Sequence, residues 1–264
     1  ALRQGANFVC SAIEHPAVAE TIRRVEQMGH TVRVLPIDAR GVVDLAACEA
    51  VIDEHTALVS CMQVSNETGA IQPVEALNKL ARRKNPNVRI HVDGVQGFMR
   101  VPMHMERMGV DLYALSGHKI HGPKGTGFLY VNSKVKIHSI VFGGGQQKGL
   151  RSGTENVPGI AGMAEAAAEC YENLEEKIDR LYALKDRFVS QVSALEGTKV
   201  NGHTGRDSAP QIVSVSFRDV RSEVLLHALE EKGIYVSAGS ACSSNKPSFS
   251  RTLKNMEIDK ELLG

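Results

Sequence analysis

Lys119 is the side chain whose surroundings in this sequence best suit covalent chemistry. It follows an apolar strand predicted over Asp111–Ser116, and a second strand is predicted over Gly125–Val131. The loop between them also carries His118 and is rich in Gly and Pro, so it cannot be core. An amine held in a partly desolvated place, as at the end of a buried strand, is suited to Schiff-base formation. We therefore expect Lys119 to bind a carbonyl-bearing ligand.

Asp93 ends another apolar run, Val88–Val92, so an acidic side chain leaves the core at the end of a predicted strand. Asp is common in turns and at helix starts, and on its own it is not specific. A carboxylate can also hold the pyridine nitrogen of pyridoxal phosphate (PLP) protonated, which makes the ring an electron sink. A lysine and an aspartate on neighbouring loops are the pair that this cofactor requires, and together they predict PLP.

Cys242 differs from the other cysteines because it lies among small residues, in Gly239–Ser244. A thiol without bulky neighbours is accessible, and it becomes reactive when a partner lowers its pKa. An incidental surface thiol is the alternative. We expect the remaining four to be small buried hydrophobes, namely Cys10, Cys48, Cys61 and Cys170. Scattered cysteines with no CxxC pair favour the reducing cytoplasm over a disulfide framework.

Strands and helices alternate over the first half of the chain, which predicts an α/β fold with a mostly parallel sheet and helices on both faces. Besides those named above, strands are predicted over Phe8–Ile13, Thr31–Leu35 and Ala57–Val64, and helices over Ala17–Met28, Val43–Glu54, Pro73–Arg83 and Met103–Met108. The carboxyl ends of parallel strands meet at one edge. We expect four loops to converge there, those with His15, Asn66, Asp93 and Ser116–Lys119.

The pattern divides the chain into a large domain over 1–157, a linking helix over 158–196 and a small domain over 197–264. The helix is predicted from the Ala, Glu, Leu and Lys spacing of Pro158–Leu195. In the small domain, alternation predicts a strand over Gln211–Phe217, followed by a helix over Glu223–Lys232 and a short strand over Ile234–Val236.

Composition and motif spacing argue against several other classes of protein. The formal charge of +1 gives no electrostatic reason to expect nucleic acid or an anionic membrane as partner. No apolar run approaches membrane-spanning length. Gly117–Lys124 has the first spacing of a P-loop, but Pro123 intervenes and no Lys-Ser/Thr pair follows. His118 and His121 have no third ligand nearby, so we expect no metal site.

Taken together, four motifs resemble class I cysteine desulfurases, which are PLP-dependent enzymes of aminotransferase class V. They occur in the family's order and, with His15, extend over nearly the whole chain: IHVDGVQ at 90–96, SGHKIHGPKG at 116–125, RSGT at 151–154 and GSACSS at 239–244. The resemblance implies fold type I, with a mostly parallel sheet of the seven-stranded type, here incomplete, and a small α+β C-terminal domain.

The resemblance also implies the roles of individual residues. Lys119 would bind PLP covalently and move the Cα proton, while Cys242 would take sulfur from L-cysteine as a persulfide and release alanine. The other implied contacts are His15 stacked on the ring, Asp93 on the pyridine nitrogen, Asn66 and Gln96 on the phenolic oxygen, Ser116 and His118 on the phosphate, and Thr154 on the phosphate from the partner subunit of a homodimer. The short SACSS loop implies class I, which hands sulfur to scaffold proteins.

Two features of the family have no counterpart in this sequence. One is an N-terminal phosphate loop, and the other is a substrate-carboxylate arginine beyond Cys242, because Arg251 lies in the wrong motif. We therefore expect a chain that lacks both terminal segments. A selenocysteine lyase, another fold-type-I PLP enzyme and an inactive fragment with an assembly role stay open as alternatives. Gly94 stands where the family often has Ala, and we expect this to be harmless.

Overall fold

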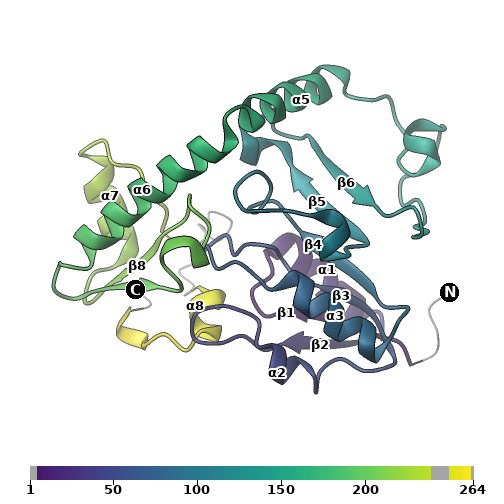
Figure 1. Ribbon diagram of the computed structural model, residues 1–264, viewed down its shortest axis with the longest axis horizontal. Helices are drawn as coiled ribbons and strands as arrows, with labels where there is room; N and C mark the ends of the chain where they lie inside the picture. Colours follow the sequence, from purple (N-terminus) through teal and green to yellow (C-terminus); the bar gives the residue numbers. More distant parts are fainter. Residues whose placement is uncertain (1–4, 239–249, 263–264) are drawn as a thin grey trace.

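The computed structural model describes residues 5–238 and 250–262 and contains one large and one small sheet (Figure 1). The large sheet has six strands, in the order β2 (Thr31–Leu35), β1 (Asn7–Ser11), β3 (Thr56–Ser60), β4 (Arg89–Asp93), β5 (Leu112–Ser116) and β6 (Gly127–Val131). All neighbouring strands are parallel except β5 and β6. The prediction of an α/β fold with a mostly parallel sheet is confirmed.

Helices cover both faces of this sheet. Helix α1 (Pro16–Gln27) leads from β1 to β2, whereas α2 (Leu45–Cys48), α3 (Val74–Lys84) and α4 (Met105–Met108) precede β3, β4 and β5. The chain moves across the sheet in one direction from β1 to β2 and in the opposite direction from β2 to β3, β4 and β5. Right-handed crossovers therefore place α1 on one face and the other three helices on the opposite face. Helix α3 accordingly contacts both α2 and α4, and Figure 1 shows it in front of the strands.

The core lies between the sheet and these helices. Strand residues such as Val9, Val59, Val92 and Tyr113 are fully buried and belong to one continuous apolar cluster. Burial of such side chains is the main source of stability for a sheet covered on both faces. The strands that carry the predicted site are therefore rigid supports.

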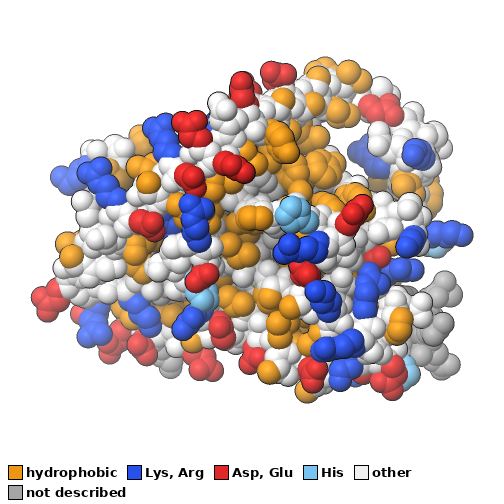
Figure 2. Space-filling view, in the orientation of Figure 1, with side chains coloured by type: hydrophobic (Ala, Val, Ile, Leu, Met, Phe, Trp, Pro, Cys, Tyr) orange, Lys and Arg blue, Asp and Glu red, His pale blue; other side chains and the backbone are white. Residues whose placement is uncertain are grey.

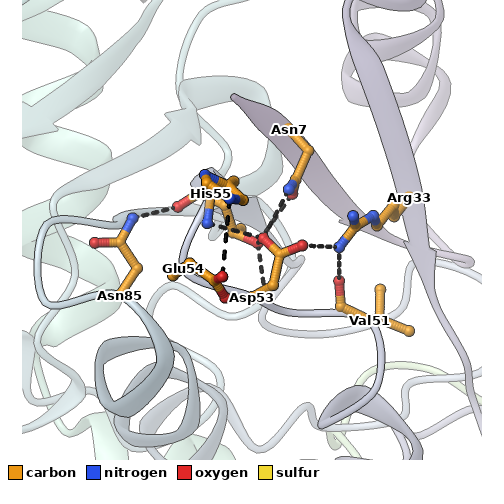
Figure 3. Close-up of polar contacts among 8 residues, drawn as sticks. Asn7, Arg33, Val51, Asp53, Glu54, His55 and Asn85 are labelled. Atoms are coloured by element: carbon orange, nitrogen blue, oxygen red, sulfur yellow. Dashed lines mark hydrogen bonds and ion pairs between the residues drawn. The ribbon is translucent and has the colours of Figure 1, made fainter. Parts of the chain in front are cut away.

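The amino-terminal edge of the sheet is fixed by a polar network around Asp53 (Figure 3). Its carboxylate accepts hydrogen bonds from Asn7 Nδ2 (2.8 Å), Arg33 Nη1 (2.5 Å) and the His55 amide (2.9 Å). Burial raises the pKa of Asp53, but the hydrogen bonds from Asn7 and Arg33 outweigh it and bring the pKa to about 2. This network ties together β1, β2 and β3 at the edge opposite to the predicted site.

The helix predicted over Val43–Glu54 is wrong in extent, since only Leu45–Cys48 is helical. The start is favourable, because the Asp44 carboxylate accepts from the amides of Ala46 and Ala47. The chain then turns away toward the Asp53 network, which fixes the following residues in a non-helical conformation. Local periodicity could not show this competition.

The long helix predicted over Pro158–Leu195 is two helices, α5 (Val157–Tyr171) and α6 (Leu174–Val192). The break falls at Asn173, whose φ of 49° lies in the left-handed region. Asn tolerates that conformation better than most residues, which explains why the pattern continues across the break.

The small sheet pairs β7 (Thr198–Asn201) with β8 (Ser214–Phe217) in antiparallel fashion. The β8 strand was predicted, but β7 has too few apolar residues to be recognised. The strand predicted over Ile234–Val236 is wrong: this segment is exposed and belongs to no strand. Helices α7 (Ser222–Glu230) and α8 (Arg251–Asn255) complete the region. The three-part domain division stays a prediction.

Short 3-10 helices occur at η1 (Gly117–Ile120), η2 (Gln146–Gly149), η3 (Gly205–Asp207) and η5 (Lys260–Leu262). Of these, η1 carries His118 and Lys119. Across the described ranges, no helix is both long and apolar enough to cross a membrane.

Candidate cofactor site

The loops that follow β1, β3, β4 and β5 meet at the carboxyl edge of the sheet, because these strands are parallel. Strand order reverses between β1 and β3, and a crevice at such a switch point is where α/β proteins bind ligands. Three hydrogen bonds join the neighbouring loops: Met62 N to Glu14 Oε1 (2.8 Å), Gln63 N to the Asp93 carbonyl (2.8 Å) and Gly94 N to the Ala114 carbonyl (2.9 Å).

His15 and Asn66 flank the switch point. His15 is half-buried and caps α1, its Nδ1 accepting from the Ala17 amide at 3.2 Å. Asn66 is half-buried in a tight turn, which the Gly69 amide closes by donating to the Ser65 carbonyl at 2.9 Å. The structure therefore places both residues at the expected edge.

Asp93 is the buried acid of the site, with 8% of its surface exposed. Its Oδ1 accepts from the Val95 amide at 3.0 Å. Within the described ranges, no Lys, Arg or His lies at ion-pair distance from it. A buried carboxylate without a cationic partner is costly, so a cation supplied by a ligand would stabilise this arrangement.

Lys119 and His118 lie on η1, directly after β5 and Ser116. Both side chains are exposed, so the expectation of a partly desolvated amine is wrong for the chain as described. The reason is the 3-10 turn, which buries Gly117 and Ile120 and packs against α5, so residues 118 and 119 face away. The Lys119 carbonyl accepts a long hydrogen bond (3.5 Å) from Arg100, in the segment that follows Asp93.

The remaining predicted residues are less closely joined. Gln96 is half-buried after Asp93, and its carbonyl accepts from Gln211 Nε2 at 2.9 Å. Thr154 is exposed before α5, and in the part of the chain that the structure describes it makes no hydrogen bond to these loops. Cys242 lies outside the described residues. The roles of all nine residues stay predictions.

The other cysteines behave largely as expected. Cys10, Cys48 and Cys61 are buried free thiols, whereas Cys170 is only half-buried. Burial raises the pKa of Cys10 to about 11 and that of Cys48 to about 12, so neither forms a thiolate readily.

Glu14 is a buried acid of the site that the sequence did not reveal. It is 3% exposed, and its Oε1 accepts from Ser11 Oγ (2.7 Å) and the Met62 amide. Its Oε2 is buried and has no hydrogen-bond partner. Burial raises the pKa of Glu14 to about 7; the hydrogen bonds oppose this shift, and the nearby charge of Asp93 adds to it. Burial therefore makes Glu14 bind a proton more readily than an exposed glutamate does.

Tyr113 of β5 contacts the residues that follow β3 and β4. It is fully buried, and its hydroxyl donates to Gln63 Oε1 at 2.6 Å, with the Gly94 carbonyl at 3.3 Å. Burial raises the pKa of Tyr113, which keeps the phenol a hydrogen-bond donor. A Cβ on Gly94 would lie 1.8 Å from Tyr113 Cζ. The position of Tyr113 therefore requires glycine here, while the expectation that Gly94 is harmless to function stays a prediction.

These features fit PLP. Asp93 is a buried carboxylate with no ion-pair partner among the described residues, which suits the protonated pyridine nitrogen of PLP, and Glu14 is an acid of the same edge with a raised pKa. Lys119 provides an exposed amine on the adjacent loop. His15 is placed beside the switch point, where a planar ring could stack on its imidazole.

Gly94→Ala should destabilise the protein by about 2 to 3 kcal/mol, because the new methyl group overpacks a stiff, buried ring. The double variant Gly94→Ala/Tyr113→Leu should lose less stability than the sum of the two single variants, since leucine vacates the contested space. Urea unfolding of all four proteins measures this. Additive losses would show that the two positions are not matched.

Glu14→Gln should change how stability depends on pH. The raised pKa means that the folded protein binds more protons than the unfolded chain between about pH 4.5 and 7. The free energy of unfolding of the wild type should therefore fall by up to roughly 3 kcal/mol as pH rises through that window. The glutamine variant should lack this fall in urea titrations at about pH 4.5 and about pH 8. An equal fall in both proteins would contradict the assignment.

The chain is similar to known proteins over almost its entire length. The sequence pattern of the family described as "Aminotransferase class-V" matches residues 1–257. A "NifS/IcsS protein homolog" of Lactobacillus delbrueckii subsp. bulgaricus is 38% identical over 96% of this chain and 66% of its own length. A "Cysteine desulfurase IscS" of Pectobacterium carotovorum is 38% identical over 98% of this chain and 64% of its own.

Solved structures agree. A protein described as "NIFS-LIKE PROTEIN" matches with a TM-score of 0.90 and 38% identity, over 99% of this chain and 68% of its own. The fold-type-I prediction is confirmed, as is the resemblance to cysteine desulfurases. This chain spans 64–66% of the length of the curated relatives just described. With a family pattern that covers all but its last residues, the chain belongs to the aminotransferase class-V family.

Proposed function

We propose that the protein is a cysteine desulfurase, which uses PLP to remove sulfur from L-cysteine and releases L-alanine. The observation that supports this most is the meeting of the Asp93 and Lys119 loops at one sheet edge, next to the switch point between β1 and β3. The names of the relatives point to the same reaction.

The residues of the edge would divide the work of holding the cofactor. The Lys119 amine would bind it, the Asp93 carboxylate would face the pyridine nitrogen, and the His15 imidazole would stack on the ring. Asn66 and Gln96 would donate to the phenolic oxygen. Ser116 and His118 would hold the phosphate, together with Thr154 of the partner subunit. When bound, PLP supplies an electron sink for negative charge at the substrate Cα.

Two side chains would take part in the chemical steps, Lys119 in proton transfer and Cys242 in sulfur transfer. Lys119 would take the proton from the substrate Cα and return one to carbon, as a positioned general base and acid. The thiolate of Cys242 would attack the substrate sulfur, so that an S–S bond forms as the substrate Cβ–S bond breaks. The electron pair of the broken bond would be protonated at carbon, which gives the methyl group of alanine. The sulfur would stay on Cys242 as a persulfide.

We further propose that the protein is a homodimer. Apolar side chains are exposed on β6, in the segment that follows it and at the start of α5: Phe128, Leu129, Ile140, Phe142, Val157 and Ile160. Figure 2 shows hydrophobic side chains gathered over this part of the molecule. Such a surface suits a protein partner, and Thr154 lies directly before α5. A second copy would explain how Thr154 reaches a phosphate.

The remaining proposals concern the cell. We place the protein in the cytoplasm, because the cysteines of the described ranges are free thiols. A scaffold protein for iron–sulfur clusters, or a tRNA thiolation partner, would accept the persulfide sulfur. We assign the cofactor to the domain over 1–157 and Cys242 to the domain over 197–264, with 158–196 as the linker.

Lys119→Ala should abolish the visible absorbance of PLP-reconstituted protein and lower alanine release from cysteine on the order of a thousandfold or more. Cys242→Ala should keep the absorbance but lose alanine release, because only the sulfur step is removed. Lys134→Ala, an exposed lysine after β6, is the matched control and should behave as wild type. Undiminished alanine release in Cys242→Ala would reject the persulfide step.

A further inference from the structure

Helix α8 packs against the sheet edge that carries the candidate site, although it lies near the end of the described chain (Figure 1). Behind it, Met256, Ile258 and Leu262 form a buried apolar cluster with Ile37, which follows β2. Apolar burial of this kind fixes the helix against the large sheet. Its polar residues are thereby presented to the neighbouring loops.

The first of these loops is the turn after β3 that contains Asn66. The carboxylate of Glu67 accepts hydrogen bonds from the hydroxyls of Ser250 and Thr252, the latter at 2.9 Å. Ser250 is also the N-cap of α8, because its Oγ accepts from the Leu253 amide at 3.0 Å. Hydrogen bonds to an ionised acceptor are the stronger class, so this is a firm junction.

The second loop is the turn between β1 and α1 that contains His15. Arg251 Nη2 donates to the Glu14 carbonyl at 3.0 Å, and Asn255 Nδ2 donates to the Ala12 carbonyl at 2.9 Å. These bonds explain Arg251, which the sequence could not place. Helix α8 therefore binds backbone carbonyls of the turn after β1 and the Glu67 side chain of the turn after β3, on the two sides of the switch point.

We propose that Glu67 is a positioning residue of the cofactor site. Through Glu67, α8 fixes the turn that carries Asn66, and through its arginine and asparagine it fixes the turn that carries His15. The helix thus sets the spacing of two loops that the proposed function assigns to PLP, and the inference rests on that function. A second, direct link joins the same two loops, because the Met62 amide donates to Glu14 Oε1 at 2.8 Å.

Each turn also has hydrogen bonds that do not involve α8: the amides of Glu67 and Thr68 donate to Ser65 Oγ, at 3.3 and 3.2 Å, and the Ala12 amide donates to the Leu35 carbonyl at 3.3 Å. The β3 turn is fixed at its far end by the Ala209 amide, which donates to the Gly69 carbonyl at 2.8 Å. The β1 turn is fixed by the Met62 amide on the Glu14 side chain. Removal of the Glu67 carboxylate leaves these bonds in place but removes the hydrogen bonds from Ser250 and Thr252, so the contact between α8 and the turn that carries Asn66 is weakened.

Hydrogen–deuterium exchange tests this coupling without requiring the loaded enzyme. In Glu67→Ala, amides of both 12–19 and 63–69 should exchange faster by about tenfold, since two hydrogen bonds to a charged group are lost. Exchange in α6 should not change. Thr252→Val removes a partner of the same carboxylate from the opposite side and should give a smaller effect of the same kind. Glu176→Ala, an exposed glutamate of α6, is the matched control.

The affinity for PLP is the second readout. Glu67→Ala should weaken PLP binding about tenfold, with Glu67→Gln intermediate because the amide keeps one acceptor oxygen. Faster exchange confined to 63–69, with 12–19 as protected as in wild type, would overturn the proposal. If the wild-type chain takes up no PLP, the proposed function fails, while the exchange result still decides whether α8 couples the two turns.

Discussion

The parallel register of β1, β3, β4 and β5 is the constraint on which the rest of the structure depends. Because these strands run in the same direction, the loops that follow them emerge at one edge, and the strand order reverses between β1 and β3, which is where α/β proteins bind ligands. The opposite edge is fixed by the Asp53 network. The chemistry is thus separated from the interactions that hold the strands together.

Two buried acids shape the electrostatics of that edge. Asp93 has no ion-pair partner among the described residues. Glu14 is buried between the loops that follow β1 and β3, and its pKa is raised. In its protonated form Glu14 can still accept the hydrogen bond from the Met62 amide, and it adds no second negative charge near Asp93. This division of roles suits a cofactor that presents a protonated ring nitrogen.

The sequence predicted what local patterns determine and missed what distant contacts determine. The apolar run before Asp93 and the strand before Ser116 were sufficient to place the acid and the lysine at strand ends. The burial of Glu14 depends on Met62, and the junction at Glu67 depends on Thr252, which is far away in the chain. The same limit explains the shortened α2, since a tertiary network at Asp53 overrode a good helical pattern.

Reductive trapping tests the central claim most directly. The PLP-loaded protein is treated with borohydride, which makes a bond between cofactor and lysine permanent, and the labelled peptide is identified by mass spectrometry. The account predicts the phosphopyridoxyl group on Lys119 alone, the lysine that follows β5, next to the strand that ends at Asp93. A PLP-loaded protein that carries the label on another lysine, with Lys119 unmodified, would contradict it.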